Sequence, residues 1–222
     1  MPKCTKKIQS SIIRPAHLRK RKDNIMARIG FKKAKYNKID TATSKYATLT
    51  GTPAVVPVFE KVVDEKFAPE YNTAELYAND GLAESDYSFK KGTLSLTVAD
   101  DDDELCAELL GNTDAEGEVT SNIDDIAPEF GYGHIIPKLV GGVRKFKVEF
   151  FPRVKFTKVT SDNKTRGESV EFSTTAIEGT VYPLETVING LTVGTWEKHK
   201  TFATLTEAEA YLDGLLTPTT KA

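Results

Sequence analysis

The sequence predicts a mainly β protein, built as a β-sandwich or small barrel with few helices. Several segments alternate apolar and polar residues with a period of two, which is typical of half-buried strands. Polar stretches rich in glycine or proline separate these segments, as expected of turns. The chain has 222 residues, of which 39% are hydrophobic and 28% charged, so it can bury a core of its own.

The first part of the chain gives only weak strand patterns. Weak strands are expected at 29–36, 54–63, 75–80 and, further along, 176–182. Pro53, Pro57 and Pro69 favour an extended loop or an edge strand over residues 52–72, because proline cannot donate to a β-ladder. Residues 112–130 are acidic and rich in turn formers, and we expect a loop there.

A clear strand at 93–98 is followed by four consecutive aspartates and a leucine-rich run. Asp100 or Asp101 suits the N-cap of a helix at about 101–110, because free N–H groups and the helix dipole favour carboxylates there. Gly111 should end this helix. The run lacks the glycine and glutamate that a calcium-binding EF-hand loop needs at its sixth and twelfth positions, so we expect no metal.

A long hairpin is expected at about 142–181. Its first strand, 145–156, alternates apolar residues with charged ones, and Pro152 predicts a bend, bulge or sheet edge. Alternation resumes at 168–174, and the polar residues 161–167 should form an exposed tip. Such a strand either bends at the proline or reaches beyond its own domain, because its extended length of roughly 50 Å exceeds that of a usual strand.

A second, short helix is expected at about 206–214. Thr206 and Glu209 have the spacing of a capping box, in which each side chain accepts from the other residue's backbone N–H. The residues predicted to face the core are Ala208, Tyr211, Leu212 and Leu215.

Charge is distributed unevenly along the chain. The formal net charge of −2 divides into about +7 for residues 1–25 and about −9 for residues 26–222. Residues 1–25 could be a nucleic-acid or membrane arm, a targeting peptide or an extension that never folds, and we expect the disordered extension. Residues 26–222 are expected to be one domain, and Met26 is an alternative translation start. An acidic domain argues against dedicated nucleic-acid binding, which needs clustered cations.

No pattern in the sequence predicts a catalytic, cofactor-binding or metal-binding residue. His17, His134 and His199 are not paired with each other or with cysteine at metal-ligand spacing. No nucleophile elbow, Walker loop or dinucleotide-binding fingerprint is present. His134 is expected at a strand edge or in packing, and Trp196 in the core. We therefore expect no enzyme activity, cofactor or metal.

Most of residues 26–181 resembles the major tail proteins, or tail tube subunits, of long-tailed phages with flexible, non-contractile tails. The matching stretches are MARIGFKKAKY (26–36), AELYANDGLAESDYSFKKGTLSLTVADDDDELCAELLG (74–111), GEVTSNIDDIAPEFGYGHI (117–135), GGVRKFKVEFFPRVKF (141–156) and TRGESVEFSTTAIEGTV (165–181). The ending TWEKHKTFATLTEAEAYLDGLL resembles the family more loosely. Residues 1–25 lie outside the match.

The resemblance implies a structural virion protein of tail-tube type that assembles as stacked hexameric rings. The tube would conduct DNA without binding it specifically, and the subunit would be found in the phage tail and, during assembly, in the host cytoplasm. Implied partners are further copies of the chain, a tape-measure protein and tail-end proteins, with no membrane. An acidic lumen would repel DNA. The alternative is a non-catalytic β-sandwich module that binds carbohydrate or a receptor on a virion or cell surface.

Overall fold

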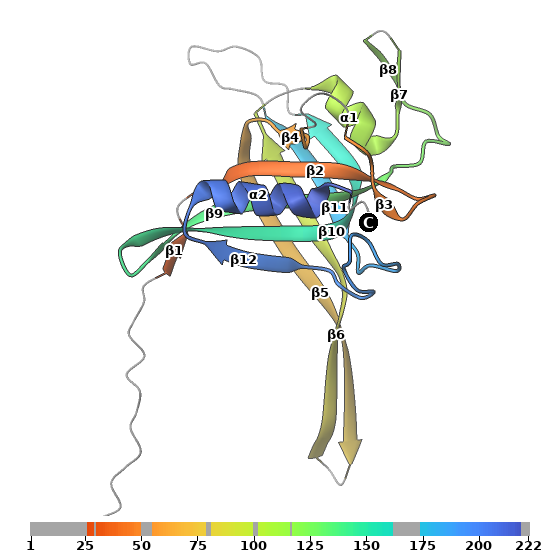
Figure 1. Cartoon of the computed structure of the whole chain (residues 1–222). Coiled ribbons are helices and arrows are strands. Elements are labelled where there is room, and N and C mark those ends of the chain that lie inside the picture. Colours follow the sequence, from red (N-terminus) through yellow and green to blue (C-terminus); the bar gives the residue numbers. More distant parts are fainter. Residues whose placement is uncertain are drawn as a thin grey trace, which may run out of the picture.

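The computed structural model describes residues 26–28, 30–49, 55–78, 81–99, 102–115, 117–161 and 174–218. A ten-stranded antiparallel sheet dominates these residues, and two helices flank it (Figure 1). The predicted mainly β class is confirmed. The predicted extension 1–25, the strand 168–174 and the tip 161–167 lie outside the described residues, apart from Ser161 and Thr174 at their borders.

The main sheet has the strand order β3-β2-β9-β10-β11-β6-β5. Three further strands pair with members of this path: β1 with β9, β4 with β2 and β12 with β10. Its strands are β1 (Met26–Arg28), β2 (Lys32–Asp40), β3 (Lys45–Tyr46), β4 (Val58–Phe59), β5 (Val62–Ala78), β6 (Gly81–Val98), β9 (Glu129–Val140), β10 (Val143–Ser161), β11 (Thr175–Val181) and β12 (Lys198–Phe202). A separate small hairpin joins β7 (Thr113–Ala115) to β8 (Glu118–Thr120). The helices are α1 (Asp103–Leu110) and α2 (Leu205–Leu216).

Strand β10 changes partners near its middle. Its first half lies between β9 and β12, and its second half pairs with β11 from Val154↔Val181 to Ser161↔Thr175. The pairing with β9 shifts register between Phe151 and Val154, so the irregularity predicted at Pro152 is confirmed. The predicted hairpin 142–181 is therefore correct only for the second half of β10, which pairs with β11. The first half pairs with β9 and β12 instead, because apolar alternation does not specify which strand is the partner.

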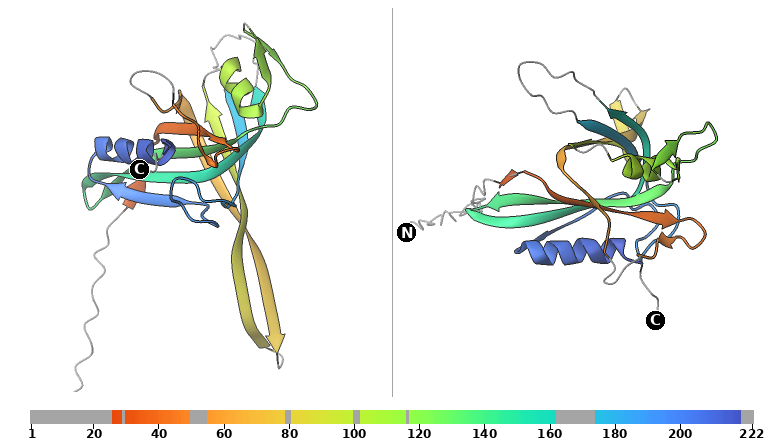
Figure 2. Two further views of the ribbon diagram at one scale, coloured as in Figure 1. Left: turned by 45° about the vertical axis from the view of Figure 1, so that its right-hand side comes forward. Right: turned by 90° about the horizontal axis from the view of Figure 1, so that it is seen from above.

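The core is divided between the two faces of the sheet. Helix α2 covers β2, β9, β10 and β12 (Figure 2). Val148, Phe150 and Leu212 belong to the apolar cluster on this face. A second apolar cluster lies on the opposite face and contains Phe156 of β10, Leu94 of β6 and other apolar residues. Both clusters contain apolar residues of β10, and the second also contains those of the strand predicted at 93–98.

Both predicted helices are present, but their first residues differ from the prediction. The N-cap of α1 is Asp102, whose side chain accepts from the N–H of Leu105 at 3.2 Å, rather than Asp100 or Asp101. Gly111 ends α1 in the left-handed region, as predicted. The capping box of α2 is Thr204 with Glu207, earlier in the chain than predicted. The Thr-x-x-Glu spacing occurs twice in succession here, so the spacing alone did not select the start.

Strand β9 was not predicted, and its glycines are the reason. Tyr46 and Leu212 pack directly on the backbone of this strand: a Cβ at Gly131 or Gly133 would lie 2.5 Å from one of their atoms. Glycine allows this close approach inside a strand, although it weakens the strand pattern in the sequence. The loop predicted at 112–130 is likewise wrong at β7, β8 and the start of β9.

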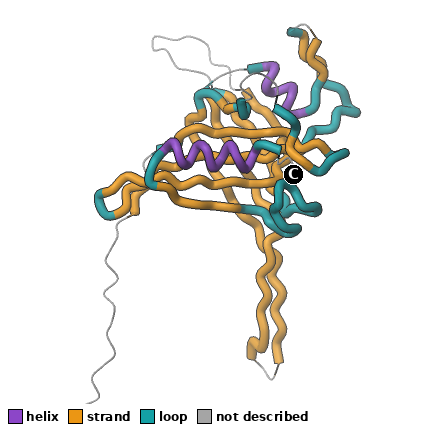
Figure 3. The backbone as a smooth tube through the Cα atoms, in the orientation of Figure 1, coloured by secondary structure: helices purple, strands orange, loops and turns teal. Residues whose placement is uncertain are grey.

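The β5–β6 hairpin projects well beyond the rest of the structure (Figures 1 and 3). The sequence had indicated a loop or edge strand at 52–72 and a short strand at 75–80. Because β5 pairs with β6 alone among the described strands, the edge-strand alternative is correct from Val62 onward, and Pro69 lies on this edge. The strand predicted at 54–63 is wrong for most of its length.

The β5–β6 hairpin has one apolar face, which continues outward from the core. Phe67 lies opposite the buried Leu94 at the root of the hairpin, and Tyr71 lies opposite Phe89 further out. Tyr71 and Tyr87 are 49% and 63% exposed. The hairpin face that carries Phe67 therefore remains aromatic in the part of the hairpin that projects from the rest of the structure.

Gly92 gives a testable prediction at the hairpin root. A Cβ there would overlap the ring of Phe67, so we expect Gly92→Ala to lower the free energy of unfolding by about 1–3 kcal/mol. Gly214, inside α2, has open space where a Cβ would stand, and Gly214→Ala should stabilise the protein by about 0.5–1 kcal/mol. Urea unfolding measures both changes, and a shift of the same sign for both variants would contradict this description of the root.

Candidate functional site

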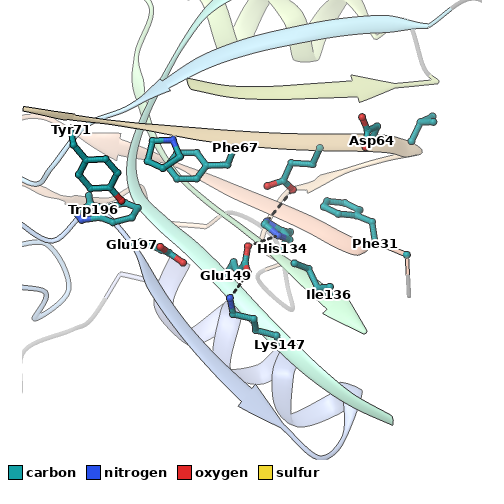
Figure 4. Close-up of a pocket in the computed structure, with 14 residues that line it drawn as sticks. Phe31, Asp64, Phe67, Tyr71, His134, Ile136, Lys147, Glu149, Trp196 and Glu197 are labelled. Atoms are coloured by element: carbon teal, nitrogen blue, oxygen red, sulfur yellow. Dashed lines mark hydrogen bonds and ion pairs between the residues drawn. The ribbon is translucent and has the colours of Figure 1, made fainter. Parts of the chain in front are cut away.

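A cavity of about 570 Å³ lies at the root of the β5–β6 hairpin (Figure 4). Its walls come from β5, β9, β10 and the segment just before β12. Aromatic side chains, among them Phe67 and Trp196, line it together with charged ones, among them Glu65, His134 and Glu149.

A row of buried charges crosses this cavity. His134 Nδ1 lies 3.0 Å from Glu65 Oε2, and its Nε2 lies 3.4 Å from Glu149 Oε2. The side chains of His134, Glu65 and Glu149 are only 2%, 7% and 12% exposed. Lys147 forms an ion pair with the same Glu149, and the Tyr132 hydroxyl donates to Glu65 Oε2 at 2.9 Å.

Strand register explains how these residues meet. Glu149 lies directly opposite His134 in the β9–β10 ladder, so both side chains leave the same face of the sheet. Glu65 reaches them from β5, on the same strand face as Phe67. The charged parity of β10, predicted as a solvent-facing side, is thus largely covered at Lys147 and Glu149 by the root of the hairpin.

Burial and charge shift the ionisation of this group. Burial alone would raise the pKa of Glu149, but hydrogen bonds and positive charge from His134 and Lys147 outweigh it and lower the pKa to about 2. Burial, reinforced by the negative charge of Glu65 and the hydrogen bond to it, raises the pKa of Tyr132 well above its ordinary value. Glu149 is therefore ionised, and Tyr132 neutral, at any ordinary pH.

The three side chains form a buried ion-pair group, with His134 between two carboxylates, and do not resemble a catalytic triad. A general base needs one ring nitrogen free for a nucleophile or substrate, whereas both nitrogens of His134 face carboxylates. In the part of the chain that the structure describes, no three His, Cys, Asp or Glu side chains are grouped to hold a metal ion. No described helix is long and apolar enough to cross a membrane.

An aromatic stack lies beside the charged row and joins the hairpin to the body. The ring of Trp196 is stacked on Phe89 with centroids 4.1 Å apart and lies 6.0 Å from Phe67. Phe67 also contacts Phe151 of β10, with centroids 4.6 Å apart. Trp196 packs partly buried against the core, close to its predicted position, but its partners come from the hairpin.

The predicted packing role of His134 is confirmed by its burial, but its charged partners were not foreseen. His199 lies on β12, where it is 60% exposed and forms an ion pair with Glu197 at 3.3 Å. His17 is outside the described residues. A buried histidine with two carboxylates has no sequence signal, because its partners are about 70 and 15 residues away along the chain.

Comparisons with known proteins leave the family open: no protein-family model matches the chain, and no curated protein has a matching sequence.

The low pKa of Glu149 gives a pH prediction. A carboxyl group whose pKa falls from 4.5 to about 2 on folding stabilises the protein above pH 4.5, and this contribution is lost as pH drops toward 2. We expect Glu149→Gln to show a weaker loss of unfolding free energy over that range than the unsubstituted protein. Urea titrations at several pH values measure the difference, and equal slopes would contradict the prediction.

Proposed function

We propose that this protein is a self-assembling structural subunit of a phage tail tube. Copies of the chain form closed hexameric rings, and the rings stack into the conduit through which DNA is delivered. The subunit belongs to the tail-tube type of β-sandwich or small barrel, acts in the virion tail and assembles in the host cytoplasm. The stretches quoted above, which resemble tail tube subunits over most of residues 26–181, support this proposal.

The observation that carries the proposal furthest is the exposed aromatic face of the β5–β6 hairpin. Tyr71 and Tyr87 continue the apolar face beyond the point where Trp196 and the core cover it. An isolated hairpin is marginally stable in water, and exposed aromatic side chains on it are a cost unless a partner covers them. A second copy of the chain is the partner that a repetitive assembly always provides.

The open border of the sheet supports self-association as well. Among the described residues, the outer side of β5 has no strand beside it, and β5 spans Val62–Ala78. Long exposed strand edges favour pairing with another chain, and closure of a ring removes such edges. The same logic explains why the working form would be a ring of copies.

The charge of the chain is compatible with a DNA conduit. Residues 26–222 carry about −9, and a negative lumen would keep DNA from adhering to the wall. Lys147, one of the lysines that could have made a lumen basic, is largely covered and forms an ion pair with Glu149. Further partners in this proposal are a tape-measure protein and tail-end proteins.

Electron microscopy of the purified full-length protein tests the proposal. We expect rings or tubes about 100 Å wide, from six domains of this mass placed around a channel. Particles that stay monomeric at every concentration, together with binding on a glycan array, would favour the alternative.

That alternative, a non-catalytic binding module for carbohydrate or a receptor, has one observation in its favour. Tyr71 and Trp196 line the root cavity together with Asp64 and Glu197, and aromatic rings beside carboxylates suit sugars. However, the ring of Trp196 is stacked on Phe89 at 4.1 Å, so this face of the ring is already covered. The binding module therefore remains the second candidate.

A further inference from the structure

We propose that Glu65, His134 and Glu149 form a proton-controlled latch that fixes the root of the β5–β6 hairpin to the body of the subunit. Glu65 belongs to the hairpin, whereas His134 and Glu149 belong to the neighbouring strands β9 and β10. A change in protonation of the imidazole would therefore change the attraction between hairpin and body. The latch concerns the single subunit and does not depend on tube assembly.

The geometry makes the contact with Glu65 depend on the charge of the imidazole. Nδ1 of His134 has no hydrogen-bond partner among the described residues, although Glu65 Oε2 lies only 3.0 Å away. Attraction at this distance thus comes from charge rather than from a well-directed hydrogen bond. A neutral imidazole has a single N–H, so it cannot present a proton to both carboxylates at once.

The other charged groups around His134 do not replace its proton. Lys147 of β10 is held by Glu149, and Tyr132 of β9 is a neutral donor to Glu65. Asp64 and Glu197, which line the same cavity, add only negative charge. Loss of the imidazole proton would therefore leave Glu65 beside a second carboxylate in a largely buried site, where like charges repel more strongly than in water.

The chain contains a built-in reporter for this latch. Trp196 is its only tryptophan, and it lies stacked on Phe89 of the hairpin. Phe67, which also packs near Trp196, is two residues from Glu65 on the same strand. If the root of the hairpin loosens, Trp196 loses these rings, gains contact with water and shifts its fluorescence emission to longer wavelength.

The test is the Trp196 emission of dilute, unassembled full-length protein over a pH series from acidic to alkaline. We expect a reversible red shift on raising the pH, with no loss of far-ultraviolet circular dichroism. Glu65→Gln should abolish the shift, because it removes the carboxylate that Glu149 would repel once the imidazole is neutral. Glu84→Gln, an exposed glutamate on the same hairpin, should behave like the unsubstituted protein.

Three results would overturn the latch. These are an unsubstituted protein whose emission does not change with pH, a Glu65→Gln variant that keeps the full shift, and a Glu84→Gln variant that loses it. If Glu65→Gln does not fold, His134→Gln replaces it: this variant has no imidazole to titrate, so a retained shift would also overturn the latch. Light scattering shows that the samples are unassembled, so failure here is distinct from failure to form tubes.

Discussion

Replacing His134 with leucine is expected to lower the free energy of unfolding by about 3–5 kcal/mol. The substitution removes the imidazole that lies between two almost fully buried carboxylates, Glu65 and Glu149; Glu149 keeps its ion pair with Lys147, so Glu65 loses most. Leucine is apolar and of similar size, so the loss would come from the uncompensated charges rather than from a cavity. Urea unfolding at neutral pH measures the change.

His199 provides a matched control for this experiment. It also forms an ion pair with a glutamate, Glu197, but it is 60% exposed on β12. Because exposed pairs contribute little, His199→Leu should change stability by less than about 1 kcal/mol. Equal losses for the two variants would show that burial of the charged row does not matter, contrary to our interpretation of the site.

Replacing both Tyr71 and Tyr87 with serine is expected to abolish rings and tubes while the subunit stays folded. Both rings are about half exposed or more in the single chain, so serine removes apolar area that only a second copy would cover. Exposed substitutions of this kind usually change stability little, which separates the loss of assembly from misfolding. Electron microscopy and size-exclusion chromatography measure the result.

The control for this pair lies on the opposite face of the same hairpin. Asn72 and Ser88 are exposed and directly opposite each other in the β5–β6 ladder. Asn72→Ser with Ser88→Ala alters the polar face and should leave assembly intact. Tubes formed by the tyrosine variant, or lost equally in both variants, would argue against a specific role for the aromatic face.

The sequence predicted local features well where a single chain segment decides them. The strand at 93–98, the irregularity at Pro152 and the glycine that ends α1 depend on alternation, on a missing N–H and on a left-handed backbone. Each is present in the structure. The exact helix starts were displaced by one or two residues because neighbouring aspartates and threonines offered alternative caps.

Features that depend on distant partners were not predictable in the same way. Gly131 and Gly133 weaken the pattern of β9, yet they are required by Tyr46 and Leu212, which come from elsewhere in the chain. The long hairpin was predicted at 142–181, with a strand that either bends at Pro152 or reaches beyond its domain, whereas the hairpin that projects from the structure is β5–β6. The prolines of the earlier segment had obscured its length.

The candidate site shows the same limitation. Alternation along β10 placed Lys147 and Glu149 on a solvent-facing side, and that inference assumes that nothing packs on this face. The root of the hairpin covers it and brings Glu65 to His134 from a distant part of the chain. A buried charged row of this kind follows from tertiary structure alone.

The central claim is that the aromatic face of the β5–β6 hairpin packs against a second copy of the chain. Photo-cross-linking from position 87 tests it most directly: a photoreactive phenylalanine analogue replaces Tyr87 in full-length protein, mixed with an isotope-labelled copy. We predict multimers whose cross-linked peptides join position 87 of one copy to another copy. Cross-links confined to single chains, in samples that contain assembled particles, would contradict the claim.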